Sequence, residues 1–120
     1  MNALQQLLEQ YRKYALIHYQ VVLGDKASVK KGNRAANQLI KIAEQIDREF
    51  ANGAEAFSAL LNERGYKIDC WAAFHLIERI KSNKQQQQKA LAVIESYAQS
   101  DDIDAPGIKL WLKNRNKKQG

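Results

Sequence analysis

Residues 68–80 read IDCWAAFHLIERI, and this stretch decides the fold. Wound as a helix, it carries apolar residues over much of its circumference, and a helix that is apolar nearly all round lies in the interior of a protein. Asp69 stands close to its start, where a carboxylate can accept bonds from free backbone N–H groups. We therefore expect a central helix over about residues 68–81, capped by Asp69.

Apolar stripes with steps of three and four residues predict five more helices around this one. The first covers about residues 2–22 and ends at Gly24 and Asp25. The second starts at Val29 or Arg34 and ends at Phe50, with Asn52 and Gly53 as its C-terminal cap pair. The others cover residues 54–64, a segment that begins near Asn83 and buries Leu91, Ile94 and Tyr97 or Ala98, and a last helix that Asp104 and Pro106 begin. No segment alternates as a strand would, so the fold class is all-α with about six helices.

The chain has 120 residues, of which 45% are hydrophobic, and this is enough for one core. We expect a single helical-repeat-like domain over residues 1–120. The end NRNKKQG has little to bury, so residues 115–120 are expected to form a frayed tail.

A faint internal repeat relates the last four helices. A shift of 34 or 35 residues places Phe57 on Leu91 and Asp69 on Asp104. Repeats of this length are typical of helix-pair solenoids, although a simple bundle of six helices predicts nearly the same stripes.

IDCWAAFHLIERI, the following KALAVIESYA and the closing GIKLWL together resemble HEAT-type repeats. The order of a long first helix, a charged second helix ending in NG and two such pairs is similar to a family of short bacterial proteins known only as a domain of unknown function. The resemblance implies a superhelix of stacked α-α hairpins and carries over no catalytic residue.

The sequence also bears on where the protein works. The opening MNALQQLLEQYRKY has no basic end followed by an apolar run, and no window approaches the roughly 18 apolar residues of a membrane span. We expect a soluble cytosolic protein with no membrane partner. Cys70 is the only cysteine, which excludes an internal disulfide, and its apolar neighbours predict a buried structural thiol.

No pattern in the sequence indicates catalysis. His18 and His75 both lie on apolar helix stripes, and no HxxxH or HExxH spacing gives either one a second metal ligand. We expect both to be hydrogen-bonded core histidines. Carboxylates such as Glu44, Asp47, Glu49 and Glu78 lie among Lys41, Arg48, Arg79 and Lys81, where pairs three or four residues apart on a helix form ordinary surface salt bridges. We therefore expect no enzyme, no metal site and no cofactor.

Two groups of residues are candidates for contact with a partner. Tyr11, Tyr14 and Tyr19, with Arg12, can form a recognition surface or can be half-buried along a helix edge. Trp71 and Trp111 are assigned to the core between repeats. Basic clusters make up much of the formal charge of +6. One contains Lys26, Lys30, Lys31 and Arg34, and the other Lys109, Lys113, Arg115, Lys117 and Lys118. Such clusters bind acidic partners or are merely solvated, and cations at a helix C-terminus also complement its dipole.

With no catalytic pattern and a solenoid-like fold, the sequence favours a non-enzymatic protein-binding module. A concrete form of this hypothesis is an immunity protein that binds and neutralises a bacterial toxin. The alternative is a nucleic-acid-binding helical-repeat protein that uses the basic clusters.

Overall fold

The computed structural model describes residues 2–119, with side chains placed as far as Lys117. The described chain is all-α and contains no strand, which confirms the predicted fold class. The helices are α1 (Ala3–Tyr19), α2 (Lys26–Glu49), α3 (Gly53–Ser58), α4 (Ile68–Glu78), α5 (Lys84–Ala98) and α6 (Ala105–Gln119), with short 3-10 turns at Ala59–Asn62 and Gly65–Lys67.

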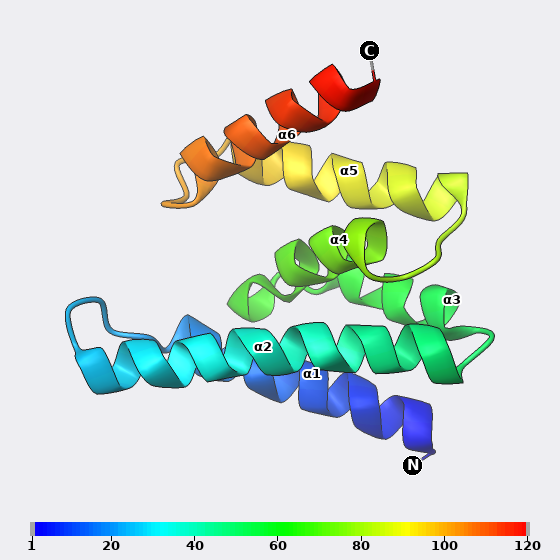
Figure 1. Ribbon diagram of the computed structural model, residues 1–120, viewed down its shortest axis with the longest axis horizontal. Coiled ribbons are helices and arrows are strands. Elements are labelled where there is room, and N and C mark those ends of the chain that lie inside the picture. The colour runs from blue at the N-terminus through cyan, green and yellow to red at the C-terminus, as the bar shows by residue number, and fades with distance from the viewer. Residues whose placement is uncertain (1, 120) are drawn as a thin grey trace.

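The helices stack as three successive pairs. Figure 1 shows α1 and α2 antiparallel at one side, α3 and α4 in the middle, and α5 and α6 at the other side. The molecule measures 41 × 40 × 22 Å. Its thickness is that of about two helices with their side chains, each about 10–12 Å across. This layering is what a stack of helical hairpins requires.

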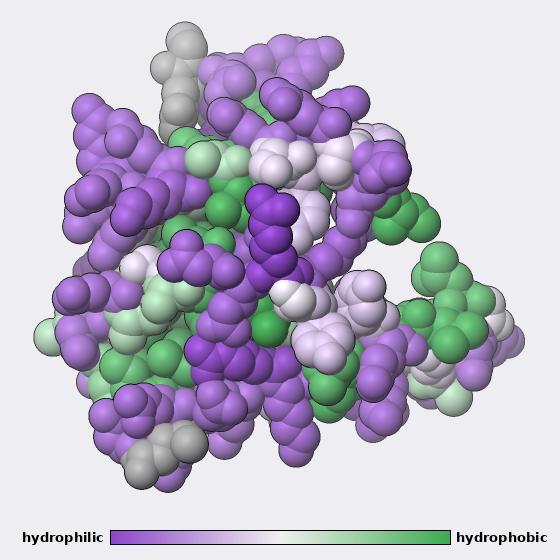
Figure 2. Space-filling view, turned by 180° about the vertical axis from the view of Figure 1, so that it is seen from behind, coloured by the Kyte–Doolittle hydropathy of each residue, from purple (hydrophilic) through white to green (hydrophobic). Residues whose placement is uncertain are grey.

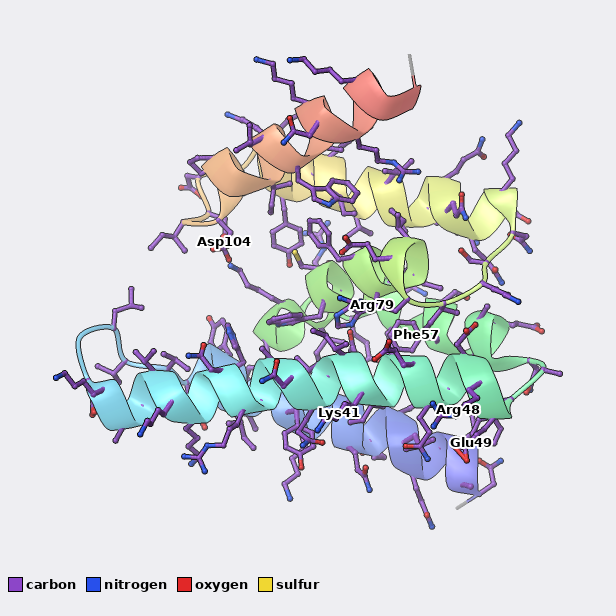
Figure 3. All side chains as sticks on the ribbon, in the orientation of Figure 1. Lys41, Arg48, Glu49, Phe57, Arg79 and Asp104 are labelled. Atoms are coloured by element: carbon purple, nitrogen blue, oxygen red, sulfur yellow. The ribbon has the colours of Figure 1, made fainter. Side chains whose placement is uncertain are left out.

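The helix α4 is the centre of the core, as its composition predicts. Ala72, Ala73 and Leu76 are completely buried, and α4 packs on α3 on one side and α5 on the other. Phe57 of α3 is also fully buried, and Figure 3 shows it beside α2. The core therefore runs through all three pairs without interruption.

The connection between α1 and α2 differs from the prediction. We expected Val21 and Val22 to continue the first helix, but α1 ends at Tyr19 and Val22 is 60% exposed in the connection. Gly24 makes the turn with φ of +94°, a conformation that glycine adopts freely. Asp25 then caps α2, because its Oδ1 accepts from the N–H groups of Ala27 and Ser28.

Helix α2 starts at Lys26, earlier than either predicted start. Its first two turns are polar, so no apolar stripe announces them. At the other end α2 stops at Glu49, and Gly53 does not belong to its cap but begins α3. A Cβ on Gly53 would lie 2.8 Å from both Cγ2 and the carbonyl oxygen of Ile46, so glycine is needed there for close packing.

Helix α4 begins without the predicted cap. Lys67 precedes it in the left-handed conformation (φ 58°), and Tyr66 is also left-handed (φ 55°). Asp69 lies inside the first turn and is buried, where its Oδ1 accepts from the Tyr97 hydroxyl at 2.7 Å and from the N–H of Cys70 at 2.8 Å. The carboxylate therefore joins α4 to α5 and accepts one N–H of the first turn of α4, but it does so from inside the helix and not from the N-cap position.

The last two helices mostly follow the prediction. Asn83 caps α5 in a capping box with Gln86, and Asp104 directly precedes α6. Helix α6 continues to Gln119, so the helix does not end at Arg115, where we expected fraying to begin. Gly120 lies outside the described residues.

No helix in the described chain has the length and apolar character needed to cross a membrane.

Candidate binding groove

A groove of about 830 Å³ opens at one side of the stack. It lies between the α1–α2 connection and the α5–α6 connection, which face each other across a gap in Figure 1. The N-terminal part of α4 forms its floor. The side chains on this floor are mostly aromatic or apolar: His18, Cys70, Trp71, Phe74 and Trp111.

The edge of the groove carries exposed apolar side chains. Four of them line it, and we call them the rim: Tyr19 (59% exposed), Leu23 (76%), Tyr66 (47%) and Ile103 (77%). Among the described side chains only two other large apolar residues are this exposed, and one of them, Val22, adjoins Leu23. Figure 2 shows hydrophobic atoms on both sides of a notch in the surface. Apolar residues clustered in this way on a surface mark an interaction site.

A charged contact ties the floor of the groove to one of its sides. Lys67 Nζ lies 2.6 Å from Asp102 Oδ1 and 2.8 Å from Asp104 Oδ2, so the turn before α4 is tied to the α5–α6 connection. Figure 3 shows Asp104 on that connection, above the beginning of α4. Burial opposes the charge on Lys67, but the two hydrogen bonds outweigh it and raise the pKa of the amine. The same contact lowers the pKa of Asp102.

The aromatic floor joins three helices. His18 of α1 packs edge-on against Trp71 of α4 with ring centroids 4.9 Å apart, and Phe74 packs edge-on against Trp111 of α6 at 4.8 Å. His18 is half-buried, and burial lowers its pKa. The two tryptophans are also only half-buried, so they pack against the core but also face the groove.

Cys70 lies in this floor but is not set up for reaction. Burial raises the pKa of its thiol to about 12. The thiolate is the nucleophilic form, so the thiol is inert near neutral pH. Among the described residues no three His, Cys, Asp or Glu side chains converge as a metal site would require.

His75 lies in the core, as predicted, together with Tyr11. The Tyr11 hydroxyl is 2.6 Å from His75 Nδ1, and it donates to that nitrogen in the neutral tautomer that carries its proton on Nε2. Burial, with a smaller contribution from Arg79, lowers the pKa of His75 to about 4. Tyr11 is completely buried and packs edge-on against Phe57, so its predicted place on a recognition surface is wrong. Its ring fills the space between α1 and α3.

Arg12 also has a structural role. Its Nε and Nη2 lie 2.8 Å from the two carboxylate oxygens of Glu63, and Nη1 contacts Glu9. This bidentate contact links α1 to the turn after α3 and occupies the guanidinium. Tyr14 is half-buried against the core, whereas Tyr19 is exposed and meets Tyr66 at 5.5 Å between ring centroids. Of the four predicted residues on α1, only Tyr19 reaches the groove.

The two basic clusters lie in different settings. Lys30, Lys31 and Arg34 are exposed on the N-terminal half of α2, beyond its first turn. The α6 cluster extends from Lys109, in the second turn of that helix, toward the C-terminal end, where cations are favoured. Lys109 and Lys113 line a second, shallower hollow between α5 and α6, and the guanidinium of Arg115 lies 5.7 Å from the centre of the Trp111 ring.

Most residues that line the groove were not predicted from the sequence to have a functional role. Leu23, Tyr66 and Ile103 were assigned no role, and Lys67 was not connected to its two carboxylates. One signal was available: VVL at residues 21–23, Tyr66 after Gly65 and Ile103 between two aspartates are apolar residues in connections, where polar residues are usual. Which connections meet in space does not follow from that signal.

Comparison with protein-family models, with curated proteins and with solved structures finds no match to this chain, so the predicted resemblance to HEAT-like proteins stays a prediction.

Proposed function

We propose that this chain is a non-enzymatic protein-binding module that takes up an apolar segment of a partner protein in the groove. The observation that carries the proposal is the rim: four large apolar side chains, 47–77% exposed, around an aromatic floor. Leaving such a cluster in water costs free energy that a partner recovers by covering it.

The open shape of the groove favours a macromolecule over a small ligand. Pockets for small molecules usually enclose most of the ligand surface. Here Leu23 and Ile103 line the groove, but about three quarters of the surface of each is exposed, so the groove does not enclose its ligand. Aromatic residues near the centre of an apolar patch are typical anchors of protein interfaces. An immunity protein that covers and neutralises a toxin is one specific form of this function.

The test is a capture experiment with matched variants of the tagged protein. Native cell extract is passed over wild type, over Leu23→Glu with Ile103→Glu, and over Leu110→Glu as the control. Leu110 is 59% exposed but does not line the groove, so its variant makes the same kind of substitution at one exposed position without touching the rim. Elution uses about 0.15 M and then about 1 M salt, over which the screening length falls from about 8 to about 3 Å.

The proposal predicts a protein that stays bound at high salt, is lost with the rim variant and is kept by the control. If every captured protein binds the rim variant as well as wild type, the groove is not the binding site. A toxin among the rim-dependent proteins would support the immunity form.

Nucleic acid binding is the second candidate, and one observation favours it. Lys109, Lys113 and Lys117 line the shallow hollow between α5 and α6, with Glu95 as the one carboxylate among its lining residues. A basic concave surface suits a phosphate backbone. In the same capture experiment, nucleic acid would be released by the salt step and would no longer bind to the variant with Lys109→Glu and Lys113→Glu. That result would support nucleic acid binding at this surface.

A further inference from the structure

The groove lies beside a part of α2 that no other layer covers. Near its C-terminal end α2 meets the end of α4: Lys81 N donates to Asp47 Oδ1 at 2.8 Å, and Arg79 is 3.8 Å from Glu44. Figure 3 shows Arg79 between these two helices. Helix α2 has 24 residues and α4 only 11, which is about 36 Å against about 17 Å of helix. The N-terminal turns of α2 therefore extend past the start of α4, as Figure 1 shows.

The walls of the groove offer no backbone pairing to an extended peptide. The described chain has no strand, and helices and their connections surround the groove. A peptide that enters an apolar groove must satisfy its own backbone N–H and C=O groups, and an α-helix does so within itself. A helix also fits the architecture, because it would extend the α4 layer over the uncovered part of α2.

Charge distinguishes the two sides of the groove. Steps of three and four residues put Lys26, Lys30 and Asn33 on one face of α2, and Asn33 lines the groove. Both lysines are exposed, and the first turn of α2 holds no acidic residue. Lys26, in the first turn, opposes the helix dipole, so it costs stability in the free protein. An acidic partner would offset that cost.

The opposite side carries less uncompensated charge. Asp102 and Asp104 both bind Lys67, which partly neutralises them. A ligand in the groove therefore meets an apolar floor, with exposed lysines beside the groove on α2 and, on the opposite side, two carboxylates that share one lysine.

We propose that the groove binds an amphipathic helix of about three turns from a partner protein, with its apolar face on the aromatic floor and rim and its acidic flank against Lys26 and Lys30. This inference rests on the proposed function and specifies the partner. Rim and floor contacts supply most of the affinity, and the two lysines select the orientation and the sign of the ligand's charge.

The probe is a displayed library of random peptides about 15 residues long, the shortest length at which an isolated helix is appreciably formed. Selection on the folded full chain is followed by counter-selection on Leu23→Glu with Ile103→Glu. Both residues are exposed, and circular dichroism checks that the variant folds. The selected peptides are expected to carry apolar residues at positions i, i+3, i+4 and i+7, a net negative charge and helical structure when bound.

Charge reversal then separates this inference from the proposed function. Lys26→Glu with Lys30→Glu should weaken the selected peptides about tenfold or more, because two favourable contacts become repulsive. Lys109→Glu with Lys113→Glu makes the same change in net charge on α6 and should leave their affinity unchanged. Rim-dependent peptides that are extended, proline-rich or basic would overturn the helix inference and keep the protein-binding groove. Recovery of no rim-dependent peptide would contradict both.

Discussion

Acidification should destabilise this protein through His75, before most carboxylates are protonated. The imidazole is 4% exposed and its pKa is about 4, against 6.5 for the ordinary group. Below about pH 6.5 the imidazole binds a proton in the unfolded chain but stays neutral in the folded chain. The contribution of His75 to the free energy of unfolding is therefore fully present above about pH 6.5 and is lost as the pH falls toward 4. From these two pKa values, the free energy of unfolding should drop by about 2 kcal/mol between about pH 7 and about pH 5.

Urea unfolding followed by circular dichroism at the two pH values measures this drop. The matched control is His75→Gln, which keeps an acceptor for the Tyr11 hydroxyl but has no proton to gain. In this variant the part of the pH dependence that is due to the imidazole should disappear, whatever its stability at pH 7. Equal losses in wild type and in His75→Gln would refute the reasoning, because the destabilisation would then come from other groups.

Three further predictions concern packing, the charged contact and the thiol. Gly53→Ala should destabilise the fold by about 1–3 kcal/mol in urea unfolding, because the new Cβ meets Ile46, whereas Gly107→Ala, with open space around its Cβ, should be neutral or stabilising. Equal effects would contradict the packing argument. Lys67→Met should cost about 1–2 kcal/mol, with a loss that shrinks at high salt; a loss independent of salt would contradict an ionic contribution. Cys70 should react with a disulfide reagent far more slowly than free cysteine at neutral pH, and rapid labelling would contradict its raised pKa.

The sequence predicted the helices best where a neighbour buries them. The apolar circumference of residues 68–80 placed α4 at the centre, and the stripe through Leu39 and Ile46 located the second half of α2. The first turns of α2 were not predicted, and the reason is physical. They are not covered by another helix, so they carry no apolar stripe to mark them.

The candidate site could not be assembled from the sequence because its parts are distant in the chain. Tyr19 ends α1, whereas Tyr66 and Ile103 lie in two different connections, and these segments meet only after the pairs have stacked. Tyr11 shows the opposite error. The sequence predicted either a place on a recognition surface or a half-buried position, but the side chain is fully buried and is hydrogen-bonded to a residue 64 positions away. Pattern identifies the apolar residues, but tertiary packing decides which of them stay exposed.

The most direct test of the central claim uses the two tryptophans of the chain, both of which line the groove. The protein is labelled with 5-fluorotryptophan, and the ¹⁹F resonances of Trp71 and Trp111 are followed while the rim-dependent partner, unlabelled, is added. Binding in the groove predicts that both resonances shift and saturate with the partner, in wild type and in Leu110→Glu. Broadening that reports complex formation, with both resonances otherwise unmoved, would show that the partner binds elsewhere and would contradict the account.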